Sequence, residues 1–411
     1  MINSHYVPRL TLRKFSDKLC LFNVQTGEYK ENIKIENAFS KLGFYNDEVE
    51  DKLNKKIESQ FGNLLSNKIL LAEGSIELNR EELQLIKKFL LVSVIRSMGN
   101  EEFMQKEKNF YIDLNELSKK YAEEHGIKEE PIAPPFIEKE IEGETPFDYW
   151  MRTLDVILET NGTPQAILEH PNKTYPAHRW SKVINDGYLG FWDSEYEHNE
   201  FVITDIGMTS ENEKGWNGIT QHNFKKTTIL MNLAMNAKND LAKLELYKLL
   251  DLHKYFTENF MMFPISAKRM IVEIDPFYKL KLGNRSSYEM LDLSQFTYMT
   301  NENLFKPNDT KYVYSQKPFK PLKYHPNDKY IYEIKKLSND ETIYCNELFL
   351  DRINTWVGFS SLDKAYESFI KYYESNSYPF VPRVDYTEMY KIINEKYNTG
   401  IDLDLIERVR K

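Results

Sequence analysis

The sequence predicts an α+β protein, in which a helical N-terminal half follows a short β-hairpin and the second half mixes strands and helices. Three patterns support this class. Two apolar runs flank a turn near the N-terminus, apolar stripes with helical spacing follow, and short β-rich runs alternate with helical segments after residue 146. With 41% hydrophobic and 14% aromatic residues in 411, the chain has enough apolar surface for a core, which excludes wholesale disorder.

The length exceeds that of one small domain, and composition divides the chain into four regions. We expect an N-terminal hairpin and helical region at 1–125, an acidic, proline-rich linker or loop at 126–145, a mixed α/β region at 146–300, and an irregular basic and aromatic segment followed by C-terminal helices at 301–411.

The N-terminal region begins with strand and turn signals. Cys20–Val24 is a short apolar run, Gln25–Glu28 has turn composition, and the pattern alternates again from Tyr29 to Ile35. This predicts a hairpin over 19–35.

Two long helices are predicted next. Asn79, with Glu82 three residues later, forms a capping-box pattern and begins a helix that we expect to reach about Tyr121. A first helix starts at Asp47. Its apolar positions need a partner, so the two helices should pack antiparallel in one bundle. The first stripe consists of Val49, Leu53, Ile57, Phe61 and Leu64, and the second of Leu83, Ile86, Leu90 and Val94.

The second half is predicted to alternate between helices and strands, with irregular sequence at 300–330. No repeat of fixed period is present, which disfavours solenoids and propellers. The expected helices span about 146–160, 224–260, 340–375 and 386–397, and the expected strands are Tyr188–Trp192, Phe201–Thr204 and Met270–Ile274.

The net charge of −9 argues against a protein that coats nucleic acid without specificity. The charge is uneven, however: residues 101–160 hold sixteen acids and seven bases, whereas 220–285 hold eleven bases and six acids, and 306–336 eight lysines and three acids. The two basic segments are candidates for contact with a polyanion. Aromatic residues interleaved with lysines between 311 and 332 suit stacking on single-stranded nucleic acid, or lysine stems that cover an aromatic surface.

Location and redox state follow from what the sequence lacks. No stretch has the roughly 18 uncharged apolar residues of a membrane helix, and the N-terminus has no signal-like apolar region. Two cysteines are too few for a disulfide scaffold or a thiolate zinc site. We therefore expect a cytoplasmic protein with reduced thiols and no membrane contact.

His5, Arg9 and Arg13 form the first candidate site. Their spacing of four residues places them on one face of a helix, although Pro8 favours an extended segment at His5 and a helix that begins near Pro8. Arginine binds phosphate through two parallel hydrogen bonds, and histidine transfers protons near neutral pH. We predict that the three side chains line a polar pocket; alternatively, His5 packs in the core and the arginines pair with acids such as Glu50 or Glu58.

Asp205 is the second candidate, because it directly follows a β-rich run, where catalytic and metal-binding carboxylates are often found. Together with Glu50 or Glu58 it is a candidate ligand set for Mg²⁺, and we assign Glu58 and Asp205 as possible metal ligands. The alternative is that Asp205 caps a turn. We further expect the Thr204-Asp205 turn to meet the His5 cluster in one shared site.

Other chemical templates are missing. The sequence has no dinucleotide-binding glycine motif, P-loop, zincin motif or serine-hydrolase elbow. Cys20, in a predicted strand, is better explained as a small core residue than as a nucleophile.

Several motifs resemble, in order, those of the bacterial family DUF4238, a domain of unknown function. His5-Tyr6-Val7-Pro8 followed by Leu12-Arg13-Lys14-Phe15 resembles the family's N-terminal motif, and Thr204-Asp205-Ile206-Gly207 stands where that family has a T-S-D-N-P-type turn. This chain lacks the serine and the Asn-Pro of that turn. The remaining similarities are Ile57–Phe61, Ile95–Ser97, Phe263–Ser266 and Asn346.

The functional expectation combines these candidates. We expect His5, Arg9, Arg13 and Asp205 to be catalytic, and Arg96, Thr204 and Asn346 to bind substrate. The leading hypothesis is a phosphodiesterase or nuclease-like effector in phage defence or a stress response, acting on nucleic acid or another phosphate-bearing molecule. The alternative is a non-catalytic module that senses a small anionic ligand or binds a partner protein.

Overall fold

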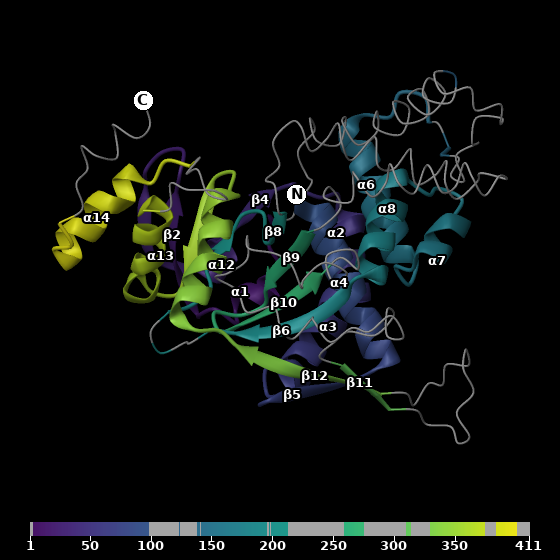
Figure 1. Ribbon diagram of the computed structural model, residues 1–411. Coiled ribbons are helices and arrows are strands. Elements are labelled where there is room, and N and C mark those ends of the chain that lie inside the picture. The colour runs from purple at the N-terminus through teal and green to yellow at the C-terminus, as the bar shows by residue number, and fades with distance from the viewer. Residues whose placement is uncertain are drawn as a thin grey trace.

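A computed structural model describes most of the chain, and the fold below concerns only these residues. They are 3–97, 123, 138–139, 141–194, 197, 199–212, 259–274, 310–313, 329–374 and 384–400. Figure 1 shows a central mixed sheet, with one group of helices around α4 (Arg80–Ser97) and another around α12 (Asn339–Asp351). No helix within the described ranges combines the length and apolar character needed to cross a bilayer.

The N-terminal segment folds as a short strand, a short helix and a hairpin. β1 (Asn3–His5) pairs antiparallel with β4 (Ser40–Leu42), and α1 (Arg9–Leu12) begins directly after Pro8. The hairpin of β2 (Lys18–Asn23) and β3 (Tyr29–Lys34) is confirmed. The Asn23 side chain accepts the backbone N–H groups of residues 25 and 26, which fixes the tight turn.

The first predicted helix is one helical run over 47–69 that contains two π-helical turns. Asn46 caps its N-terminus by accepting the Val49 N–H at 2.8 Å. π-helical turns are rare and often occur at functional sites. The run consists of α2 (Asp47–Leu53), the π-helical turn η2 (Asn54–Glu58), α3 (Ser59–Leu64) and the π-helical turn η3 (Leu65–Ile69).

The second helix, α4 (Arg80–Ser97), packs antiparallel to this run, as predicted. Its capping box is confirmed by reciprocal 2.8 Å hydrogen bonds between Asn79 and Glu82. Glu82, at the start of α4, contacts Lys68 at 2.6 Å, whereas Arg96, at its end, contacts Glu58 at 2.5 Å. Residues beyond Ser97, where we expected the helix to continue, lie outside the described residues.

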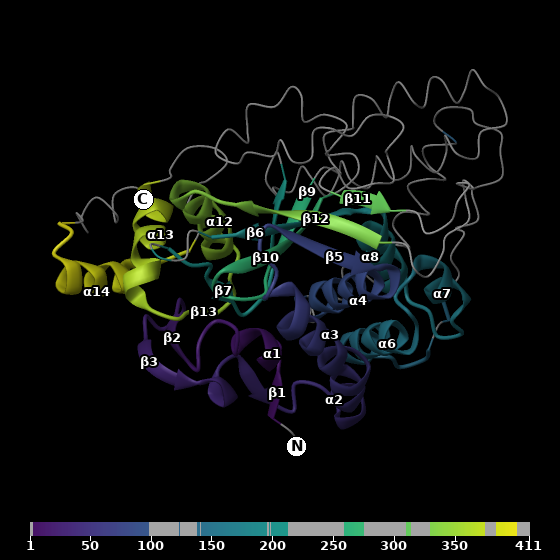
Figure 2. The same cartoon turned by 90° about the horizontal axis from the view of Figure 1, so that it is seen from below.

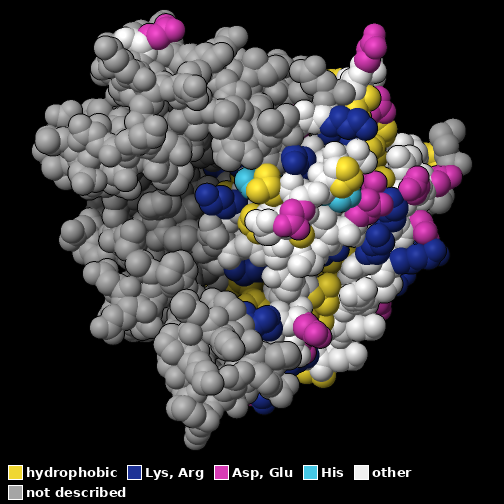
Figure 3. Space-filling view, turned by 90° about the vertical axis from the view of Figure 1, so that its right-hand side faces the viewer, with side chains coloured by type: hydrophobic (Ala, Val, Ile, Leu, Met, Phe, Trp, Pro, Cys, Tyr) yellow, Lys and Arg dark blue, Asp and Glu magenta, His cyan; other side chains and the backbone are white. Residues whose placement is uncertain are grey.

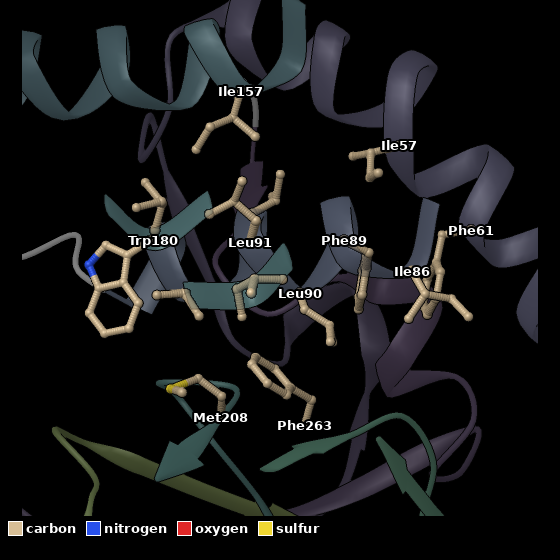
Figure 4. Packing of buried hydrophobic residues seen from close by; sticks show 14 of the residues in the cluster. Ile57, Phe61, Ile86, Phe89, Leu90, Leu91, Ile157, Trp180, Met208 and Phe263 are labelled. Atoms are coloured by element: carbon tan, nitrogen blue, oxygen red, sulfur yellow. The ribbon is translucent and has the colours of Figure 1, made fainter. Parts of the chain in front are cut away.

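Three further helices complete this layer. The predicted helix is confirmed as α6 (Pro146–Glu159); α7 (Pro164–Glu169) and α8 (Tyr175–Asp186) were not predicted. Each has a proline at its first or second position, a signal for a helix start. Side chains from the helices and the sheet form one core, and in Figure 4 Leu90 and Leu91 lie between Trp180 on one side and Ile57 on the other.

The largest described sheet has seven strands and joins both halves of the chain. The strand order is β11-β12-β6-β10-β9-β8, with β5 also paired to β12, and β12–β6 is the parallel pair. Its strands are β5 (Ser75–Asn79), β6 (Tyr188–Asp193), β8 (Thr209–Asn212), β9 (Asn259–Pro264), β10 (Arg269–Ile274), β11 (Thr310–Val313) and β12 (Lys329–Lys336).

A second sheet, of order β3-β2-β13-β7, brings the N-terminal hairpin together with the C-terminal region. β13 (Trp356–Phe359) is an inner strand that pairs antiparallel with β2 on one side and with the edge strand β7 (Ile203–Thr204) on the other. Three helices lie in this part of the molecule, near β2 and β13 in Figure 2: α12 (Asn339–Asp351), α13 (Leu362–Glu374) and α14 (Thr387–Tyr397).

Several element predictions need correction. The helix expected over 340–375 is interrupted by β13, whose Trp-Val-Gly-Phe sequence favours a strand and fits between β2 and β7. The stretch expected to be irregular contains β11 and the start of β12. The strand expected over 201–204 is limited to β7. The helix expected over 224–260 lies largely outside the described residues, and its last two positions belong to β9.

Candidate functional site

Arg96, on the last turn of α4, is the centre of the candidate site. Its side chain is only 3% exposed, and its Nη2 donates to Glu58 Oε1 at 2.5 Å. Its guanidinium carbon lies 5.5 Å from the centre of the Tyr45 ring, within cation–π range. Its Nε and Nη1 are buried without a hydrogen-bond partner among the described residues. Buried polar groups are normally hydrogen-bonded, so these two donors need an explanation.

Polar groups from three other elements surround Arg96. Glu58 belongs to the π-helical turn η2, and Glu50 to α2. One oxygen of Glu50, Oε2, and the hydroxyl of Tyr45 are also buried without a partner in the described structure. Burial raises the pKa of Tyr45, the charge of Arg96 lowers it, and the charges of Glu50 and Glu58 raise it further. We call Ser4, His5, Tyr45, Glu50, Glu58 and Arg96 the Arg96 cluster.

His5 and Ser4 enter the cluster from β1. His5 is buried, and its Nε2–H donates to the Ile35 carbonyl at 3.3 Å, which leaves Nδ1 as the basic nitrogen of the neutral ring. Burial, and then the charge of Arg9, lower the pKa of His5, whereas the Glu58 carboxylate raises it. The ring is therefore neutral at neutral pH. Ser4 hydrogen-bonds to Glu50 and accepts the Tyr45 N–H at 3.5 Å.

The pKa of Glu50 is raised, chiefly by burial and further by the Glu58 charge, while Arg96, Ser4 and Arg9 oppose this. The buried guanidinium of Arg96 contacts one of these carboxyl groups, Glu58, and its charge also lowers the pKa of the other, Glu50. Such coupled groups, with one carboxyl group displaced toward its neutral form, are typical of functional sites, although ion-pair networks also produce them.

Arg269 provides a contrast at the same depth, because its side chain is 4% exposed. Its Nε and Nη2 donate to the two carboxylate oxygens of Asp193 at 2.5 and 2.7 Å, and its remaining bonds go to the carbonyls of Ile69 and Ala72. A structural arginine in this fold therefore has all three nitrogens bonded. Arg96 uses one.

Arg9 and Arg13 do not accompany His5 into the interior. Both are exposed, and Arg13 lies 4.0 Å from Glu36 with a side chain that is 59% exposed. The predicted three-residue pocket is therefore wrong for the two arginines. His5 lies on the extended strand β1 and a helix begins after Pro8, as Pro8 indicated, but α1 turns Thr11 and Leu12 toward the core instead of the two arginines. Arg9 still influences His5 and Glu50 electrostatically, which places it at the edge of the cluster.

Asp205 lies next to the N-terminal motif but has other partners. A Cβ added at Gly207 would lie 3.7 Å from Val7 Cγ2, so this turn packs against the motif. The Asp205 carboxylate accepts the Asn354 N–H at 3.1 Å. Within the described ranges, Asp205 forms no ion pair with Arg9 or Arg13. Its position fits the alternative that it caps a turn, here the loop before β13.

The Asp205 environment leads to a prediction about pH. Burial raises the pKa of Asp205 to about 6, against opposing hydrogen bonds from the backbone of residues 354–356. The folded state therefore favours the neutral acid: this contribution to stability is present below the unfolded pKa near 4 and is lost as the pH rises through 6. We expect Asp205→Asn to raise the free energy of unfolding by about 1–2 kcal/mol at pH 7.5 and to change it little at pH 4. Thermal unfolding at both pH values measures this; destabilisation at pH 7.5 would contradict it.

Thr204 and Asn346 are fully buried. Asn346 accepts the Val202 N–H at 2.9 Å and donates to the Glu200 carbonyl at 2.7 Å and the Ser368 hydroxyl at 2.9 Å. The Glu200 carboxylate accepts the N–H of Ser360 at 2.6 Å, just before α13. These contacts join the segment before β7 to α12 and α13, which is a structural role; binding of substrate by these two residues stays a prediction.

The predicted Mg²⁺ ligands are engaged elsewhere. Glu58 pairs with Arg96, and Asp205 accepts the Asn354 N–H. Over the part of the chain that the structure describes, no three His, Cys, Asp or Glu residues are grouped so that they could hold a metal ion. The arrangement instead suits a ligand that accepts hydrogen bonds from Arg96.

Sequence reasoning identified His5, Glu58 and Arg96 separately, and the structure brings them together. It missed Ser4 and Tyr45 as members of the cluster. The sequence contained one signal for the cluster as a whole. Two acids, Glu50 and Glu58, stand eight residues apart on one predicted helix and so lie on the same face of it. A concentration of basic side chains does not mark a binding site on the face shown in Figure 3. There, basic and acidic side chains are interspersed over the described residues.

Comparison with known proteins gives one match. The model of a family described as "Protein of unknown function (DUF4238)" matches residues 3–363, a span that includes every residue of the Arg96 cluster. The chain matches no curated protein and no solved structure.

Proposed function

Because the chain belongs to the DUF4238 family, whose description gives no activity, we propose a function from the site itself: the protein binds a small anionic, phosphate-bearing ligand at the Arg96 cluster. The observation that carries this proposal is the incomplete bonding of Arg96. A guanidinium has five N–H donors, and its planar fork matches phosphate oxygens. Arg96 Nε and Nη1 retain theirs for a ligand.

The cluster is connected to the surface, as ligand entry requires. Glu58 is 20% exposed, Glu50 is half-buried, and the exposed Arg9 lies at the edge. Arg9 also supplies a second positive charge for a ligand that bridges surface and interior. The buried Arg96 would hold the anion strongly, because hydrogen bonds to charged groups are shielded from water there.

Phosphodiester hydrolysis is the second candidate, and the state of His5 favours it. Its neutral ring has a basic Nδ1, and it shares the cluster with Arg96 and two carboxyl groups. A neutral histidine is able to take a proton from an attacking water while Arg96 stabilises charge on the phosphoryl oxygens. A role in defence or stress stays a prediction.

Direct contact with nucleic acid by the lysine and aromatic segment has weaker support. Two described lysines of the basic segment 306–336, which contains this stretch, are engaged within the protein. Lys329 pairs with Glu77 at 2.7 Å, and Lys335 pairs with Glu341 at 2.9 Å and lies over the Trp192 ring. This agrees with lysine stems that cover an aromatic surface, although most of the two basic segments lies outside the described residues.

Calorimetric titration with bis(p-nitrophenyl) phosphate tests the proposal. We expect the wild-type protein to bind this phosphodiester, and Arg96→Lys to weaken binding at least about tenfold, because lysine cannot provide the bidentate fork. Release of p-nitrophenol in the same samples would reveal hydrolysis. His5→Gln should then abolish the release and retain binding.

Arg152→Lys is the matched control. Arg152 is another largely buried arginine, but its guanidinium is occupied by Glu144 at 2.6 and 2.8 Å and by two carbonyls. This variant should lose stability without losing affinity. Equal affinity of Arg96→Lys and wild type would contradict the proposed site.

A further inference from the structure

We propose that the Tyr45 hydroxyl binds the same anion as Arg96, so that the phenol and the guanidinium form one set of donors for a phosphate group. This inference rests on the proposed function and adds to it a binding residue in the loop between β4 and α2. It assigns to the site a second side chain whose polar group serves the ligand and not the fold.

The packing of the Tyr45 ring fixes the position of its hydroxyl. The residue is 3% exposed, with the Phe44 ring edge-on at a centroid distance of 4.8 Å and the Trp150 ring at 5.5 Å. The guanidinium carbon of Arg96 lies over the Tyr45 ring, 5.5 Å from its centre. A phenol oxygen lies in the plane of its ring, so rotation of the hydroxyl moves only the proton and cannot bring the oxygen to another partner.

The arrangement of the two side chains suits a shared anion. The hydroxyl is attached to the edge of the ring that Arg96 faces, and two hydrogen bonds of about 2.8 Å to oxygens of one phosphate span a gap of this size. The Tyr45 hydroxyl, like Nε and Nη1 of Arg96, is buried without a hydrogen-bond partner among the described residues. Unbonded buried donors are rare, and one anion that accepts from all of these accounts for them together.

A second arginine–tyrosine pair in the same fold shows what a structural pair looks like. Arg152 lies over the ring of Tyr149, 5.1 Å from its centre, and Tyr149 is fully buried. There the tyrosine hydroxyl donates to Glu138 at 2.7 Å, and the guanidinium donates to Glu144 at 2.6 and 2.8 Å. This pair has protein acceptors for its polar groups, whereas the tyrosine hydroxyl in the Arg96 cluster has none within the described ranges.

The protonation state of Tyr45 agrees with a donor role. Burial raises the pKa of Tyr45 more than the charge of Arg96 lowers it, so the hydroxyl keeps its proton near neutral pH. The competing explanation is a hydrogen bond from Tyr45 to Glu50, whose Oε2 is also buried and unbonded in the described structure. Such a bond would stabilise the fold, whereas a bond to a ligand would not, so stability and affinity together separate the two explanations.

Tyr45→Phe tests the proposal, because it removes the hydroxyl and keeps the ring against Arg96. We expect the melting temperature of the unliganded variant to equal or exceed that of wild type, since the hydroxyl has no bond to lose within the protein. Calorimetric titration with bis(p-nitrophenyl) phosphate should show an affinity at least about tenfold weaker, the effect of losing a hydrogen bond to a charged group. The same compound should raise the melting temperature of the variant less than that of wild type.

Tyr149→Phe is the matched control. It should lower the melting temperature, because Glu138 loses its bond, and leave the affinity for bis(p-nitrophenyl) phosphate unchanged. Wild-type affinity in Tyr45→Phe would overturn the role of the hydroxyl and leave the site at Arg96 intact. A lowered melting temperature or a failure to fold in Tyr45→Phe would show that the hydroxyl bonds within the protein, and would also overturn it. Absence of binding to wild type would instead reject the proposed function.

Discussion

Replacement of Arg269 by methionine is expected to lower the free energy of unfolding by about 3–5 kcal/mol, the typical cost of removing one partner of a buried ion pair. The variant leaves the Asp193 carboxylate, only 5% exposed, without its counter-ion. It also leaves the carbonyls of Ile69 and Ala72 without their donor. The Ile69 carbonyl lies at the end of the helical run over 47–69 and the Ala72 carbonyl just beyond it, so the loss separates this run from the start of β10.

Chemical denaturation of Arg269→Met beside Lys55→Met measures this effect. Lys55 pairs with Asp51 at 2.7 Å on the surface, with a side chain that is 72% exposed. Its replacement should change the free energy of unfolding by less than about 0.5 kcal/mol. If both variants show the same small change, the Arg269 bridge is not the structural link that its bonding indicates.

Asn346→Leu should cost about 2–4 kcal/mol, because leucine has nearly the same size but makes none of the three buried hydrogen bonds. The Val202 N–H, the Glu200 carbonyl and the Ser368 hydroxyl lose this partner at a site with no exposed surface on the asparagine. The segment before β7 would then separate more readily from α12.

Thermal and denaturant unfolding of Asn346→Leu, with Asn54→Leu as the control, checks this prediction. Asn54 is exposed and accepts one bond from Ser59 at 3.3 Å, so its replacement should be nearly neutral. Wild-type stability in Asn346→Leu would show that the network contributes little. It would also leave ligand contact as the better explanation for the burial of an asparagine at this position.

Local signals predicted the parts of the fold that depend on local physics. The hairpin over 19–35 and the capping box at Asn79 and Glu82 are confirmed because turn and cap hydrogen bonds involve residues close in sequence. β13 was missed because its strand conformation depends on pairing with β2, more than 330 positions earlier in the chain. Periodicity within one segment contains no information about such a partner.

The lack of long-range information in local patterns also explains why the candidate site could be predicted only in part. His5, Glu58 and Arg96 were chosen from separate motifs, but only the antiparallel packing of α4 on the first helical run, with β1 beside it, brings them into one cluster. The extended segment at His5 and the helix after Pro8 were expected, but local spacing did not reveal that α1 would leave Arg9 and Arg13 exposed. Glu58 was considered as a partner for Arg9 and Arg13, whereas the structure pairs it with Arg96.

The central claim is that Arg96 is kept for a ligand and not for stability, and the double variant Glu58→Gln with Arg96→Met tests it most directly. Removal of both partners of a buried pair is often neutral or stabilising, and Arg96 has two further donors that burial leaves unbonded. We predict a free energy of unfolding within about 1 kcal/mol of wild type, together with complete loss of bis(p-nitrophenyl) phosphate binding. A loss of about 3 kcal/mol or more with binding retained would contradict the account and make the Arg96 cluster a structural bridge.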